Sequence, residues 1–226
     1  MKRITLILTI LFTSLGLFAQ TNFYKISIGG GAGTTLAFAD LNKKTLAFAG
    51  YGTLDYFITH YVNIGFEFQK GELAGGDITF DPNNRQFINS YISGTGNIKV
   101  QLGEFLTQYH LNNVILNNLR GLYAGVGFGY IKNKISNVRY YGENYYPGAD
   151  KSVEGIVPIN LGINFYFPDK WDHTRYAINL NLQNTIAIGE GLDGYGSSGA
   201  KHNDMYSYFS VGVRYHFGPF GLDKRR

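Results

Sequence analysis

The sequence contains no cysteine, which excludes a disulfide framework, a thiolate zinc site and a lipid-modified N-terminal cysteine. Proline is also scarce, with 5 residues in 226, whereas glycine, tyrosine and phenylalanine number 30, 18 and 17. This balance suits strands joined by tight turns better than it suits helices or disorder. The composition therefore predicts an all-β chain, and no break in it argues for a second domain.

A strong excess of charge of either sign is missing as well. Without Lys2 and Arg3, 18 of the 20 basic residues remain against 16 acidic ones. A chain this close to neutrality gives no support for nucleic-acid binding. No cofactor or metal motif is present either, because the histidines are scattered and the glycine runs follow strand periodicity.

Lys2 and Arg3 precede an apolar run over residues 4–18 that ends at Ala19-Gln20. This order of basic, apolar and small residues is typical of a secretory signal peptide, predicted here over residues 1–19. A membrane anchor is the alternative, but the run is shorter than the ~20 residues that a spanning helix needs. An Ala-Gln pair at this point is similar to signal peptides of the Bacteroidota.

Through most of the remaining chain, apolar residues alternate with polar or small ones, as they do in strands with one apolar face. Pro158 cannot donate a ladder hydrogen bond and is expected at a rim or bulge. The segment 104–120 breaks the alternation with nearly helical spacing, which predicts a short helix or two. Eight strands are predicted, over residues 23–32, 46–56, 62–69, 91–102, 122–130, 157–167, 176–183 and 206–217.

The last strand, about 12 residues long, would cross roughly 30 Å when tilted near 40°, which is the depth of a bilayer's apolar layer. Its residues Ser210, Gly212, Tyr215 and Phe217 follow the pattern of polar, glycine and two spaced aromatics. This pattern resembles the C-terminal assembly signal of bacterial outer-membrane barrels. The chain departs from that pattern by continuing past Phe217 as a basic tail over residues 218–226.

Alternation alone fits both a soluble barrel and a membrane barrel. The apolar face of the predicted strands carries no charge. Three features favour the membrane: aromatics on that face lie near strand ends, short connections alternate with long ones, and glycines on the polar face of 122–130 leave room inside for charged side chains. The long connections are predicted over residues 70–85, 132–154 and 189–204. In lipid an open sheet edge is costly, so the first strand must pair with the last.

The chain thus resembles the small eight-stranded outer-membrane barrels of the OmpA/OmpX-like class, specifically the short Bacteroidota type, and in size and architecture it is similar to PorG, a secretion-system barrel. The resemblance implies an antiparallel up-and-down transmembrane barrel over residues 20–217, placed in the bacterial outer membrane by its assembly machinery. No peptidoglycan-binding domain fits after Phe217. The segment 104–120, predicted to lie in the periplasm, is longer than such turns usually are.

An interior enclosed by eight strands is only wide enough for side chains. The charged residues predicted to pair inside it and plug the lumen are Lys25, Asp55, Glu67, Lys99 and Arg214. Structural ion pairs are the first interpretation of this cluster, and a narrow solute pathway is the alternative.

A binding role is the other class of function. The tyrosines of the outer loops offer contact area at low ordering cost, although they could equally pack on one another. These residues are Tyr140, Tyr141, Tyr145, Tyr146 and Tyr195. The segment 104–120 and the tail could instead dock a periplasmic protein. A lipid-modifying enzyme is the alternative, but no His-x-Ser pair lies on a lipid-facing strand, so the chain is predicted not to be an enzyme.

Overall fold

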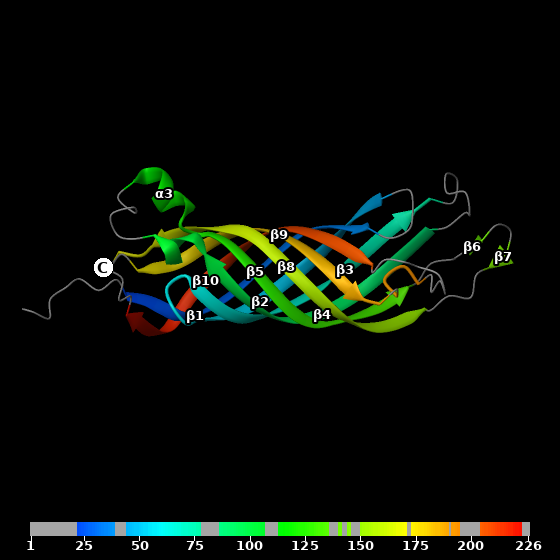
Figure 1. Ribbon diagram of the computed structural model, residues 1–226, viewed down its shortest axis with the longest axis horizontal. Helices are drawn as coiled ribbons and strands as arrows, with labels where there is room; N and C mark the ends of the chain where they lie inside the picture. Colours follow the sequence, from blue (N-terminus) through cyan, green and yellow to red (C-terminus); the bar gives the residue numbers. More distant parts are fainter. Residues whose placement is uncertain are drawn as a thin grey trace, which may run out of the picture.

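Eight antiparallel strands close into a barrel in a computed structural model of the chain (Figure 1). The structure describes residues 22–38, 44–77, 86–106, 113–135, 140–141, 144–145, 150–170, 173–189, 191–194 and 204–222. The barrel strands are β1 (Asn22–Phe38), β2 (Lys44–Phe57), β3 (Val62–Gly76), β4 (Gln86–Gln101), β5 (Leu122–Ile135), β8 (Lys151–Pro168), β9 (Thr174–Ile188) and β10 (Met205–Leu222). The predicted eight-stranded up-and-down architecture is confirmed.

The sheet closes where β1 pairs with β10, from Asn22 opposite Leu222 to Phe38 opposite Met205. The register shifts between Tyr24 and Ile26. On β10 this shift falls at Gly218, whose φ of 89° belongs to the left-handed region that glycine adopts without strain. Closure leaves neither strand with an unpaired edge, which is the condition for a sheet surrounded by lipid.

The two ends of the barrel differ. At the turn end, β1 begins, β10 ends, and short turns join β2 to β3 and β8 to β9. The opposite, loop end carries the β1–β2, β3–β4, β5–β8 and β9–β10 connections. The β5–β8 connection contains the two-residue strands β6 (Tyr140–Tyr141) and β7 (Asn144–Tyr145) (Figure 1). The predicted signal peptide over residues 1–19 and the last four residues of the tail lie outside the described residues.

The insertion between β4 and β5 lies at the turn end (Figure 1). It contains the 3-10 helix η1 (Leu102–Phe105) and the short α-helix α3 (Val114–Leu119), as its helical spacing predicts. Thr59 of the β2–β3 turn donates a 2.7 Å hydrogen bond to Glu104, and the backbone N–H of Gly103 donates to the carbonyl of Arg120 over 2.8 Å. No helix among the described residues is long and apolar enough to cross a membrane.

Several strands are longer than predicted. β3 runs to Gly76 instead of ending at residue 69, β5 runs to Ile135 instead of 130, and β10 continues past Phe217 to Leu222. The first two extensions carry outward-facing lysines, Lys70 and Lys132, which resemble loop residues in the sequence. In β10, Gly218 and Pro219 resemble the end of a strand in the sequence. In the structure they lie at the register shift between β10 and β1, and the strand continues past them.

Pro158 lies inside β8, and the prediction of a rim or bulge position is wrong. Its partner on β9 is Thr185, and the register with β9 is unbroken there. On the other side, the pairing of β8 with β5 skips residues 157 and 158 and then resumes in the same register. The sheet therefore accommodates the missing N–H as a local gap in one ladder.

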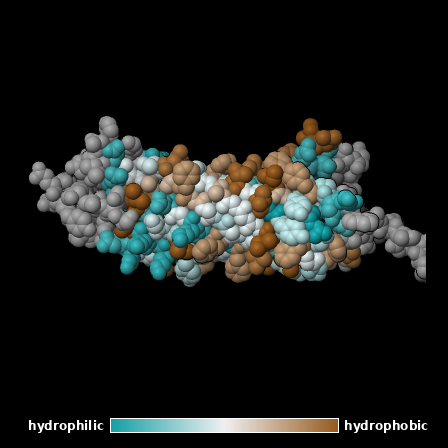
Figure 2. Space-filling view, turned by 180° about the vertical axis from the view of Figure 1, so that it is seen from behind, coloured by the Kyte–Doolittle hydropathy of each residue, from teal (hydrophilic) through white to brown (hydrophobic). Residues whose placement is uncertain are grey.

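Polar and apolar side chains separate by face. The outer face is apolar: Phe66 is 72% exposed and Val213 is 65% exposed. Among the described strand residues, outward-facing Lys and Glu lie only near the loop end, and Figure 2 shows apolar residues over the middle of the barrel. The inner face buries amides, hydroxyls and charges, including Asn160, Gln183 and Arg214. This is the reverse of a water-soluble barrel.

Candidate functional site

Four of the five charged residues assigned to the lumen face inward and form two ion pairs, one between adjacent strands and one between the two strands that flank β1. Lys99 of β4 lies 3.4 Å from Glu67 of β3, and Arg214 of β10 lies 2.5 Å from Asp55 of β2. The side chains of Arg214 and Asp55 are 5% and 2% exposed. A buried charge is tolerated when it is paired and hydrogen-bonded, and Asn63 supplies Asp55 with a further 2.8 Å bond.

Lys25 takes part in neither of these pairs. It lies between Tyr24 and Ile26, at the step where the register of β1 against β10 shifts, and it is half-buried. The alternation of residues in β1 predicts that Lys25 faces the lumen. The register shift, however, lies near the turn end, and Lys25 lies closer to that end than the two ion pairs do. The structure therefore does not bring Lys25 into the lumen cluster.

An amide and tyrosine network, which was not predicted, fills the middle of the lumen. Asn179 donates to Tyr123 (3.0 Å) and Asn164 (2.9 Å), while Tyr123 donates to Asn181 (2.9 Å) and Asn181 donates to Asn160 (3.0 Å). These bonds join β5, β8 and β9. The signal in the sequence is the pair of asparagines on the same face of each of β8 and β9.

Inward-facing glycines make room for the large inner side chains. A Cβ at Gly125 would lie 2.7 Å from Cγ of Lys99, and one at Gly29 would lie 2.9 Å from Cγ of Arg214. A Cβ at Gly65 would lie 2.3 Å from the carboxylate of Asp55. Each distance is shorter than side chains tolerate, so the glycines and the charged residues fit one another across neighbouring strands.

The half of the lumen nearer the loop end contains an apolar core beside buried polar residues such as Asn89 and Asn133, and the prediction of a plug formed by charged residues did not include this core. Leu192, from the β9–β10 connection, is buried in this core, and Asn89 donates a 2.8 Å hydrogen bond to its carbonyl. The core consists of Ala37, Ala49, Leu73, Phe87, Tyr91, Ile131, Ile135, Ile156, Ala187, Leu192, Tyr206 and Tyr208. Several of these residues lie on the parts of the strands that extend beyond the predicted bounds.

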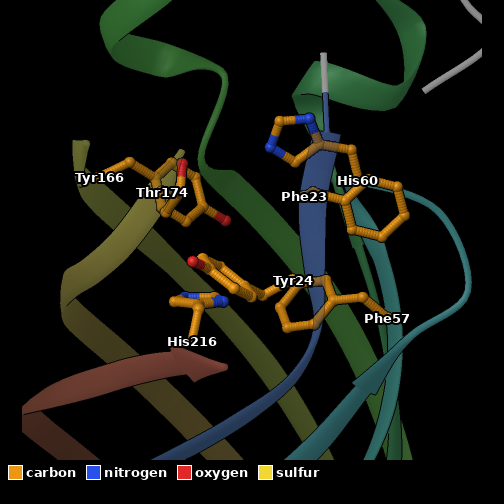
Figure 3. A pocket seen from close by; sticks show the side chains of 7 residues that line it. All are labelled: Phe23, Tyr24, Phe57, His60, Tyr166, Thr174 and His216. Atoms are coloured by element: carbon orange, nitrogen blue, oxygen red, sulfur yellow. The ribbon is translucent and has the colours of Figure 1, made fainter. Parts of the chain in front are cut away.

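Near the turn end, aromatic rings leave a cavity of about 10 Å³, enough for about one water molecule (Figure 3). His216 faces into it, with its ring 5.2 Å from Phe57 and 6.1 Å from Tyr166. Tyr166 in turn donates a hydrogen bond to Gln101. His60 stacks on Phe23 and Tyr61, at 5.3 and 4.4 Å. This end of the lumen is also filled.

The four residues of the expected assembly signal divide between the two faces of β10. Ser210 and Gly212 face the lumen and are buried, whereas Tyr215 faces outward and Phe217 is half-buried. The strand continues to Leu222, so the exposed side chain of Phe220 adds one more outward aromatic beyond the expected end.

The loop tyrosines are placed only in part. Tyr140, Tyr141 and Tyr145 lie on the small β6–β7 sheet, where Tyr140 pairs with Tyr145 through the backbone. Their side chains, and the whole of Tyr146 and Tyr195, lie outside the described residues. Among the described residues no group of three His, Asp or Glu side chains could hold a metal ion.

No model of a known protein family matches the sequence, and no curated protein sequence matches it. Among solved structures, Neisserial surface protein A is similar, with a TM-score of 0.50, 13% identity, and coverage of 85% of this chain and 97% of that one. The attachment invasion locus protein Ail of Yersinia pestis has a TM-score of 0.46 at 14% identity, covering 88% and 99%. The chain has the fold of the small eight-stranded outer-membrane β-barrels.

Proposed function

We propose that the chain is an integral protein of the bacterial outer membrane with a closed lumen, which serves as a structural and docking component. The filled interior carries this proposal. Two ion pairs, an amide network and an aromatic core occupy the space that a solute would need. By analogy with barrels of this class, the turn end faces the periplasm and the loop end faces outward.

A closed lumen predicts that the purified, folded protein is electrically silent. Reconstituted into a planar bilayer under an applied potential, it should give no steps above those of a heat-unfolded sample of the same preparation. Reproducible single-channel steps from the folded protein would instead support the narrow solute pathway and remove the basis for a purely structural lumen.

The docking part of the proposal rests on the insertion. α3 has 6 residues and none is buried. Val114 and Ile115 at its start are 74% and 69% exposed, and the side chain of Asn113 accepts a 2.9 Å hydrogen bond from the N–H of Ile115. The apolar side chains are thus held on an ordered turn beside the barrel (Figure 2). We assign them to contact with a periplasmic protein.

A photo-reactive residue at position 115 tests this contact against a matched position on the same helix, Asn118. In cells, cross-linking from position 115 should yield a protein-sized adduct that the Val114→Asn substitution reduces at least severalfold. Cross-linking from position 118 should give much less of this adduct. Adducts of lipid alone, or equal adducts from the two positions, would contradict a protein contact.

An enzymatic role finds no support in the described histidines. His216 lies inside the barrel between aromatic rings, away from the outer face. His173 lies in the β8–β9 turn, 3.8 Å from Asp169. A lipid-modifying enzyme needs a nucleophile and a base together at the level of the lipid. The proposed role is therefore non-enzymatic.

A further inference from the structure

Four lysines gather on the outer wall at the loop end. Lys70 extends from β3, Lys132 and Lys134 from β5, and Lys151 from β8, and all four side chains are exposed. Within the described part of the chain, none of their ammonium groups forms a salt bridge. We call these four residues the lysine patch.

The strand register places the patch in two adjacent rows. Lys134 lies directly opposite Lys151 across the β5–β8 pair. In the next row, Ile92 of β4 lies between Lys70 and Lys132. Like charges directly opposite each other on a sheet are destabilising, so the Lys134–Lys151 pair costs stability unless an anion shares it.

Acidic side chains near the patch do not neutralise it. Glu72 lies on the outward face in the row of Lys134, but Ser90 of β4 separates the two. Its backbone carbonyl accepts a hydrogen bond from Thr35, and no salt bridge among the described residues involves its carboxylate. Asp150, next to Lys151, is also exposed, so four cations face two acids and the surface keeps a net positive charge.

The depth of the patch is set by the apolar surface below it. Lys70 is two residues beyond Phe68 on the same face of β3, and Lys132 is two residues beyond Tyr130 on β5. Phe68 and Tyr130 are both exposed on the lipid-facing wall. At roughly 3.3 Å per residue, the lysine Cα atoms lie just past the apolar layer, and their long side chains can reach the headgroup level.

We propose that the lysine patch binds phosphate groups on the lipid headgroups of the outer leaflet. This inference rests on the proposed membrane-spanning role and orientation. Phosphates favour clustered lysines, because several ammonium groups can share one or two multiply charged anions. A bound phosphate between Lys134 and Lys151 also removes the repulsion that their register imposes.

The test is Lys134→Glu, compared with Lys170→Glu in the exposed β8–β9 turn at the opposite end, which changes the net charge equally. Diphosphorylated lipid A is offered to the full folded protein in detergent, and retained lipid is counted by native mass spectrometry. Retention should fall about tenfold for Lys134→Glu and stay unchanged for Lys170→Glu. Dephosphorylated lipid should be retained weakly by all three proteins.

The stability of the variant shows whether Lys134 binds a ligand or stabilises the fold. Lys134→Glu places opposite charges across the pair with Lys151, so its unfolding transition in detergent should move to higher urea while lipid retention falls. If it fails to fold, the double substitution Lys132→Gln and Lys134→Gln should give the same loss of lipid.

Three results of the lipid-retention experiment would overturn the proposal. They are unchanged retention in the Lys134 variants, an equal loss in Lys170→Glu, or equal retention of the dephosphorylated lipid. Preferential binding of a soluble sulfated polysaccharide through the same lysines would also overturn it. None of these outcomes depends on whether the barrel conducts solutes or docks a protein at its turn end.

Discussion

Replacing Arg214 with alanine is expected to lower the free energy of unfolding by about 3–5 kcal/mol, because it leaves the carboxylate of Asp55 buried without its cation. Asp55 is 2% exposed, and water cannot easily replace the guanidinium. The remaining hydrogen bond from Asn63 is too little for a full charge. The loss should therefore greatly exceed that of an exposed lysine such as Lys170→Ala.

Urea unfolding in phosphatidylcholine vesicles measures this loss, and a charge-neutral double variant shows its cause. The double substitution Arg214→Gln and Asp55→Asn replaces the ion pair with neutral hydrogen-bonding groups. It should lose much less stability than Arg214→Ala, since no buried charge remains unpaired. Equal losses in the single and double variants would show that packing, not charge, accounts for the effect.

The sequence predicts the faces of the strands well because alternation is local. In 62–69 and 206–217 every second side chain belongs to one face, and the structure places Glu67, Arg214 and Val213 on the predicted sides. The strand ends are less predictable. Above the apolar layer both faces of a strand can be polar, so Lys70 and Lys132 resemble loop residues although they continue β3 and β5.

The interior was predicted only in part for a related reason. Charges on a polar face must pair inside a closed barrel, but the choice of partner depends on shear and register. The sequence therefore assigned Lys25 to the same cluster as Lys99, whereas an irregularity near the turn end separates them. Much of the apolar core, including Leu73 and Phe87, lies on strand extensions that resemble loops in the sequence, so the alternation does not reveal it.

Replacing Val213 with arginine has the second largest expected effect. Val213 is 65% exposed on β10, in a row with Gly30 and Gly52 on neighbouring strands and far from the charged strand ends. If lipid surrounds this wall, an arginine there must enter the apolar layer, and the expected cost is about 2–4 kcal/mol. If water surrounds it, an exposed arginine costs almost nothing.

The free energy of unfolding of Val213→Arg in lipid vesicles tests most directly whether this wall faces lipid. Val153→Arg, on the outward face near the loop end, is the matched control, and it should cost only about 0–1 kcal/mol because it lies near the headgroups. A wall embedded in lipid predicts a clear depth-dependent difference between the two variants. Equal, near-zero costs at both positions would contradict a barrel embedded in a membrane.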